Sequence, residues 1–146
     1  MRGMSSIVQV ITGLMAGMLI LYGGYITLHG HLTPGGGFAG GVLIAAALIL
    51  VSLAFGSVEQ VERKEYILSS IFESFGGLGF LALALTGYFA FDCFFRNAGV
   101  FLIGKPLQLV SGGVIPLANI AIGLKVGAGL FAIFLALGAS RFVMKE

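Results

Sequence analysis

The chain has 146 residues, of which 58% are hydrophobic and only 10% are charged, and its formal net charge is +2. Its mean hydropathy of +1.08 excludes a soluble globular protein, because a soluble domain needs about 25% charged residues to cover its surface. The same hydrophobicity excludes intrinsic disorder, and the small, scattered positive charge excludes a nucleic-acid-binding surface. The single cysteine, Cys93, cannot form an internal disulfide or a thiolate metal cage.

Four apolar runs are long enough to cross a membrane, since a helix needs about 20 apolar residues to span roughly 30 Å of hydrocarbon. They cover about residues 6–28, 38–56, 66–91 and 116–142. The first run is too long for the apolar part of a signal peptide and no small-residue cleavage site follows it, so we expect a permanent helix. The sequence therefore predicts an all-α membrane protein with four transmembrane helices, in which residues 1–146 form a single integral membrane domain.

The connections between these runs differ in composition. Residues 29–37 are too rich in glycine to be helical and predict a broken segment after the first span. Residues 57–65 hold five of the fourteen formal charges of the chain and must lie in water. Between the third and fourth spans, the apolar segments 100–103 and 107–110 flank a Gly-Lys-Pro sequence, which predicts a small β-hairpin at the membrane surface.

The distribution of Lys and Arg predicts the orientation, because cytoplasmic loops carry an excess of both. Five basic residues fall on the side of the four spans that holds both termini, and two fall on the other side. The five are Arg2, Arg63, Lys64, Arg141 and Lys145, and the two are Arg96 and Lys105. We therefore expect a multi-pass protein of the cell membrane with both termini in the cytoplasm.

An ionisable residue, Lys125, lies deep in the fourth span, nine residues after Pro116 and sixteen before Arg141. It is thus about 14 Å from one end of the helix and 24 Å from the other, where a lysine costs on the order of 2.5 to 3.5 kcal/mol. At helical spacing its face carries small residues, which are typical of a helix–helix interface: Ala118, Ala121, Ala128, Gly129, Ala132 and Ala136.

Desolvation in such an interface disfavours the charged ammonium group, so the group could release and regain a proton. The sequence therefore predicts that Lys125 is buried among alanines, on or beside a proton or cation path. The alternatives are a permanent structural ion pair with a neighbouring helix and a side chain that snorkels to the membrane surface.

Glu73 is a second candidate for the ion path, because it lies seven residues into the third span on a small and partly polar helix face. Measured from the cytoplasmic side, the depths of Glu73 and Lys125 differ by roughly 13 to 14 Å in upright helices. Direct contact between them is therefore not expected without tilt, and both charges would need partners in other subunits or in a hydrated path. The alternative for Glu73 is a carboxylate near the end of its helix that reaches the membrane surface.

Three glycines within residues 35–40 match the pattern G-x-G-x-x-G. A dinucleotide-binding site requires a strand before this pattern and a helix with a soluble face after it, whereas here a membrane-length run precedes it. The glycines instead predict a broken start of the second span and pairs of small residues at the spacing of close helix contacts. The residues of this structural motif are Pro34, Gly35, Gly36, Gly37, Gly40 and Gly41.

Three further polar residues are candidates for the ion path. His29 and His31 adjoin the glycine segment and could titrate near neutral pH, although such histidines are often merely interfacial. Asn119 is a polar residue within the fourth span. No nucleophile triad, phosphate-binding loop or zinc-ligand spacing is present, so we expect no enzyme activity and no metal site in this chain.

Residues 30–41 have the sequence GHLTPGGGFAGG. This segment resembles the G-H-x-x-P-G-G-G-F-x-G-G stretch that follows the first helix in MnhB-type (MrpB-type) subunits of multisubunit Na⁺/H⁺ antiporters. Residues 112–129, GGVIPLANIAIGLKVGAG, resemble the branch of that family found in archaeal membrane-bound hydrogenases and sulfane-sulfur reductases. The free-standing antiporters more often carry an acidic residue in the last helix.

The resemblance implies a subunit that works only inside a large membrane assembly, where it helps to form the sodium path while sister subunits provide the main proton channels. It also implies that Na⁺ is transported and that iron–sulfur or nickel–iron cofactors belong to partner subunits. A purely structural assembly subunit without a role in conduction remains the alternative.

Overall fold

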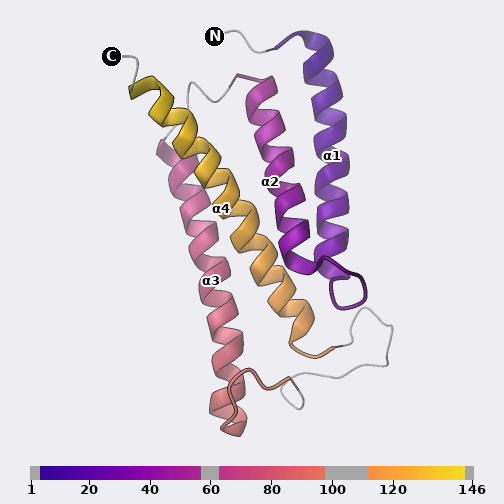
Figure 1. Ribbon diagram of the computed structural model, residues 1–146, viewed down its shortest axis with the longest axis vertical. Coiled ribbons are helices and arrows are strands. Elements are labelled where there is room, and N and C mark those ends of the chain that lie inside the picture. Colours follow the sequence, from indigo (N-terminus) through magenta and orange to yellow (C-terminus); the bar gives the residue numbers. More distant parts are fainter. Residues whose placement is uncertain (1–3, 57–62, 98–111, 144–146) are drawn as a thin grey trace.

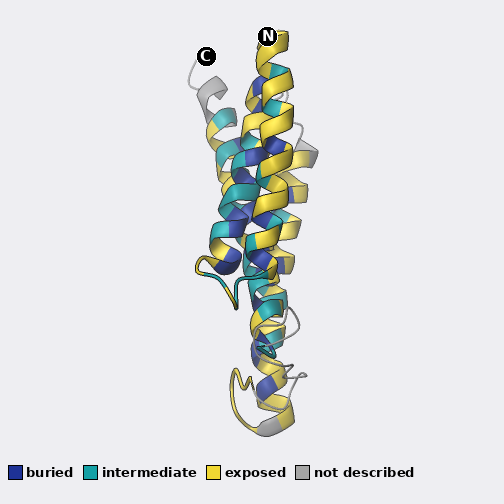
Figure 2. Cartoon of the chain, turned by 90° about the vertical axis from the view of Figure 1, so that its right-hand side faces the viewer, coloured by how far each residue is buried: buried dark blue, intermediate teal, exposed yellow. Residues whose placement is uncertain are grey.

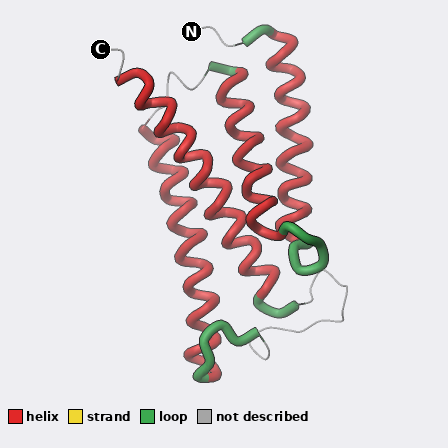
Figure 3. Tube along the Cα trace, viewed as in Figure 1, coloured by secondary structure: helices red, strands yellow, loops and turns green. Residues whose placement is uncertain are grey.

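The computed structural model describes residues 4–56, 63–97 and 112–143 of the chain. Helix α1 comprises Ser6–Leu28, α2 Gly36–Ala54, α3 Arg63–Phe91 and α4 Ile115–Val143. All four are long and apolar enough to cross a membrane, which confirms the predicted all-α membrane protein with four spans. The described residues contain only helix and loop (Figure 3), and the predicted hairpin of residues 100–110 lies outside them.

The helices pack side by side in the order α1, α2, α4 and α3 (Figure 1). Within the described residues, α2 and α3 do not contact each other, because α4 lies between them. Helix α1 begins and α4 ends at the same end of this layer. The layer is thin when it is seen from the side, and exposed residues cover much of the face in view (Figure 2).

Small residues form most of the buried core. Ala45, Ala47, Ala54 and Ala84 are almost fully buried, and Leu135 is the largest fully buried side chain. Large apolar side chains point outward instead, as on Phe89, which is 82% exposed. This arrangement suits a bilayer, where association depends on close packing of small residues and lipid solvates the outward apolar groups.

The helix bounds follow the hydropathy closely, but α2 and α3 begin earlier than predicted. Helix α2 begins two residues earlier than predicted, so that Gly36 and Gly37 belong to its first turn. The chain reverses direction just before it, at Gly35, whose φ of +122° is one that only glycine adopts readily. Helix α3 begins three residues earlier than its apolar run, at Arg63.

Candidate functional site

An ion pair joins the middle parts of α3 and α4. The Nζ atom of Lys125 lies 3.3 Å from Oε1 of Glu73 and donates a hydrogen bond to it. Each residue lies ten positions after the first residue of its helix, which is about 15 Å along the helix axis. The two charges are thus well inside the membrane-length helices, and they neutralise each other within this chain.

We expected no direct contact between Glu73 and Lys125 in upright helices, yet the two side chains are in contact. That expectation placed the cytoplasmic ends of the third and fourth spans at the same depth, whereas α3 and α4 are shifted along each other (Figure 1). A Cβ atom at Gly76 would contact Ala121 and Lys125, and one at Gly129 would contact Glu73. Lys125 is therefore level with the turn of α3 that runs from Glu73 to Gly76.

The shift is fixed by backbone contact at glycine. A Cβ atom at Gly76 would be 2.6 Å from the Lys125 nitrogen and 2.8 Å from the Ala121 oxygen. Distances below 3.0 Å are not compatible with a real side chain, so only glycine allows α3 to approach α4 this closely. The same approach brings the Lys125 side chain across α3, where a Cβ atom at Gly77 would be 3.8 Å from Lys125 Cε.

The prediction that Lys125 is buried among alanines is wrong within this chain. The side chain of Lys125 is 52% exposed and that of Glu73 is 40% exposed, although Ala118, Ala121 and Ala132 on the same side of α4 are buried. The reason is that α3 presents glycine at this level. Glycine lets the Lys125 backbone pack tightly but has no side chain to cover the ammonium group.

The ion pair lies outside a large apolar groove on the molecule. An apolar groove of about 760 Å³ lies over α4 and is lined by residues of all four helices. Its polar side chains are those of Thr27, Ser52, Glu65 and Ser69. Neither Glu73 nor Lys125 lines this groove, so the charged pair faces a different side of the layer.

The glycine motif packs α2 between α1 and α4. A Cβ atom at Gly40 would collide with Thr27 of α1, and one at Gly37 would collide with the Asn119 carbonyl of α4. A Cβ atom at Gly41 would lie 2.7 Å from the Gly123 oxygen. Neighbouring helices occupy the space beside these glycines on both sides of α2. The glycines therefore serve helix packing and not nucleotide binding. Pro34, in the turn before α2, is exposed.

Asn119 connects α4 to the start of α2. Its Oδ1 atom accepts a hydrogen bond of 3.4 Å from the backbone N–H of Gly37, which is one of the N–H groups that a helix start leaves without an internal partner. Its Nδ2 atom is buried and has no hydrogen-bond partner among the described residues. Asn119 is six residues from Lys125, or about 9 Å along α4, so it belongs to the glycine motif and not to the ion pair.

The two histidines lie at the glycine turn. The Nδ1–H group of His29 donates to the Tyr25 carbonyl at 3.0 Å, and the two rings stack with centroids 4.1 Å apart. His31 is half-buried, and a Cβ atom at Gly112 would be 3.5 Å from its ring. The structure thus brings Glu73 and Lys125 together, and it places His29, His31 and Asn119 in a separate group around the turn.

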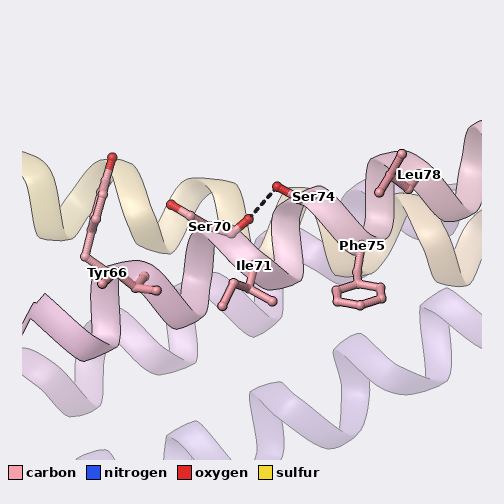
Figure 4. A pocket seen from close by; sticks show the side chains of 7 residues that line it. Tyr66, Ser70, Ile71, Ser74, Phe75 and Leu78 are labelled. Carbon is pink, nitrogen blue, oxygen red and sulfur yellow. Dashed lines mark hydrogen bonds between the residues drawn. The ribbon is translucent and has the colours of Figure 1, made fainter.

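Sequence reasoning missed a group of hydroxyl residues on α3. Tyr66, Ser70 and Ser74 follow one another at intervals of four residues and line a shallow hollow on the outer face of the helix (Figure 4). The four-residue spacing was visible in the sequence, but only the packing shows that, within the described part of the chain, the hollow is lined by α3 alone. Among the described residues, no three His, Cys, Asp or Glu side chains are grouped as a metal site requires.

Four helices that are long and apolar enough to cross a membrane, with a charged pair between α3 and α4, define a multi-pass membrane protein. Residues 7–132 match a family described as a domain related to the MnhB subunit of Na⁺/H⁺ antiporters. The chain belongs to this family, which confirms the resemblance drawn from residues 30–41.

Two relatives show the range of the family. The chain is 37% identical over 136 residues to an uncharacterized protein of Methanocaldococcus jannaschii, an alignment that covers 90% of this chain and 52% of the relative. It is 33% identical over 100 residues to a Na⁺/H⁺ antiporter subunit of Bacillus subtilis, covering 68% of this chain and 60% of the relative. The chain therefore spans about half to three fifths of the length of these relatives.

A solved structure gives the same assignment. The fold is similar to a chain of the membrane-bound sulfane sulfur reductase, an archaeal respiratory membrane complex, with a TM-score of 0.75 and 33% sequence identity. The match covers 91% of this chain and 57% of that one. This likeness supports the branch of the family that residues 112–129 indicated.

Proposed function

We propose that this chain is a non-catalytic membrane subunit of a multisubunit Na⁺/H⁺ antiport module that is joined to a respiratory redox complex. Membership of the MnhB-related family and the likeness to a respiratory membrane complex support this proposal. Other membrane subunits would be its partners, Na⁺ its transported ion, and any iron–sulfur or nickel–iron cofactor would belong to those partners. The basic residues favour the cell membrane with both termini in the cytoplasm.

The observation that carries the proposal is the half-exposed ion pair between Glu73 and Lys125. A charged side chain near the centre of a bilayer costs on the order of 2.5 to 3.5 kcal/mol on insertion scales, so such residues face protein or water and not lipid. Because this chain covers only about half of each side chain, the remainder is covered by another subunit or by water between subunits. Either arrangement places the pair at a subunit interface.

Such a pair is suited to exchange one cation for another. Glu73 is an oxygen ligand that holds the Lys125 ammonium group at 3.3 Å, so a sodium ion that arrives at the carboxylate competes with that group. The single carboxylate of Glu73 cannot neutralise a sodium ion and the ammonium group at the same time, so binding of the one cation weakens binding of the other. Competition of two cations for one carboxylate is a coupling of the kind that an antiporter requires.

Substitution of Lys125 separates this proposal from a purely structural role. In the assembled complex, we expect Lys125→Ala to abolish the Na⁺-dependent pH change across membrane vesicles while the subunits still purify together. Lys125→Arg retains the charge and serves as the matched control for assembly. If Lys125→Ala assembles and exchanges ions normally, the conduction role is refuted. If it dissociates the complex, the double variant Glu73→Gln with Lys125→Met, which leaves neither charge uncompensated, decides the question in its place.

A further inference from the structure

The outer face of α3 carries a row of three hydroxyl groups from Tyr66, Ser70 and Ser74. In Figure 4 these three side chains point to one side of α3, whereas Ile71 and Phe75 point to the other. Tyr66 is 45% exposed, and Ser74 is exposed as well. The row spans nine residues, about 12 Å along the helix, and the other side chains that line the hollow are apolar.

The hydroxyl row leads to the ion pair. Glu73 is three residues from Ser70 and adjoins Ser74 along the same helix, so all lie within about one quarter to one third of the helix circumference. The Lys125 side chain extends over Gly77, three residues beyond Ser74. The row therefore begins near the N-terminal end of α3 and ends at the two charges.

The hydrogen bonding of Ser74 leaves the lone pairs of its oxygen available to accept or coordinate. Its hydroxyl group donates to the Ser70 carbonyl at 2.8 Å, which uses the single proton of the group. The oxygen lone pairs that remain can only accept or coordinate. A hydroxyl group in this state resembles the oxygen ligands that replace the water shell of an ion in a channel.

We propose that Tyr66, Ser70 and Ser74 form one wall of a hydrated route by which Na⁺ reaches Glu73 from the N-terminal end of α3. A transmembrane helix of another subunit closes the route by packing on the apolar rim of the hollow, formed by Ile71, Phe75 and Leu78. The hollow has a volume of about 430 Å³ and, among the residues that the structure describes, is lined by α3 alone, so we assign its second wall to another subunit. This inference rests on the proposed function and adds the direction and residues of access.

Cysteine substitution in the assembled complex tests the route. Cys93 is first replaced by serine, and Ser70→Cys and Ser74→Cys are then treated with a charged, membrane-impermeant thiol reagent from each side. We expect both to react from the side of the α3 N-terminus, more slowly when Na⁺ is present, while Ile71→Cys and Phe75→Cys do not react. No reaction at positions 70 and 74, or equal reaction at all four positions, overturns the inference.

A second measurement covers the case in which a cysteine variant does not assemble. The double variant Ser70→Ala with Ser74→Ala should raise the Na⁺ concentration for half-maximal exchange by at least about fivefold, which is the effect of losing even one of the two polar contacts. Thr86→Val, which removes a hydroxyl group elsewhere on α3 where it bonds to the Leu83 carbonyl, should leave that concentration unchanged. An unchanged concentration in the double variant also overturns the inference.

The two proposals fail in different ways. In one outcome, Lys125→Ala abolishes exchange while cysteines at positions 70 and 74 do not react with the thiol reagent and the double serine variant needs no more Na⁺ than the wild type. In that case the ion pair acts in exchange, and Na⁺ reaches it by another route. If Lys125→Ala exchanges ions normally in an intact complex, the proposed function itself is refuted.

Discussion

The glycine at position 76 should control both the stability of the α3–α4 pair and the geometry of the ion pair. A methyl group added there would lie 2.6 Å from Lys125 N, 2.8 Å from Ala121 O and 2.9 Å from Lys125 Cα, all of which belong to the α4 backbone. To reach ordinary contact at 3.4 Å, the two helices must separate by about 0.8 Å. The same separation would lengthen the 3.3 Å contact between Lys125 and Glu73 to about 4 Å.

Gly77→Ala is the matched control, because a methyl group at that neighbouring position would meet only Lys125 Cε, at 3.8 Å. Both substitutions gain the same helix propensity, up to about 1 kcal/mol. The difference in the free energy of unfolding between the two variants therefore measures the cost of the steric clash alone. Overpacking of this kind typically costs about 1 to 3 kcal/mol. We therefore expect Gly76→Ala to be less stable than Gly77→Ala by that amount.

Thermal unfolding of the purified complex in detergent measures the difference, and vesicle assays measure the Na⁺-dependent pH change of the same preparations. Gly76→Ala should lower the unfolding midpoint and the exchange rate relative to Gly77→Ala. Equal midpoints and equal rates for the two variants would refute the claim that Gly76 sets the approach of α3 and α4.

Two further predictions concern the start of α2. Gly40→Ala should impair assembly severely, because its methyl group would collide with Thr27 and lie 2.6 Å from the Gly23 oxygen. Co-purification of the subunits measures assembly. Normal yields would show that α1 and α2 need not pack this closely. Asn119→Ala should lower the unfolding midpoint by the equivalent of about 1 kcal/mol, because the Gly37 N–H group loses its acceptor. Asn119→Asp retains an acceptor oxygen, so its midpoint should fall less. Equal losses in both variants would argue against a stabilising role for the hydrogen bond between Asn119 and Gly37.

Hydropathy was sufficient to predict the four helices, because the length of an apolar run is a direct physical requirement for crossing a bilayer. The family could also be inferred from residues 30–41, whose turn requires glycine at Gly35 with its φ of +122°. Both inferences rest on local properties of the chain. Neither depends on how one helix lies against another.

The axial shift of α3 against α4 could not be predicted in the same way. Both helices have 29 residues, and their apolar runs permit several relative depths of similar energy. The depth is selected by contact between Gly76 and the α4 backbone, which the sequence does not specify because several other glycines in α3 and α4 offer comparable contacts. The pairing of Glu73 with Lys125 and the exposure of both side chains follow from that one contact.

The central claim is that Glu73 and Lys125 act in ion exchange and do not merely hold helices together. The most direct test is the double variant Glu73→Gln with Lys125→Met, which removes both charges and leaves neither uncompensated, so that packing is expected to survive. We predict that this complex assembles with wild-type stability but shows no Na⁺-dependent pH change in vesicles. Exchange at the wild-type rate in the intact double variant would contradict the claim.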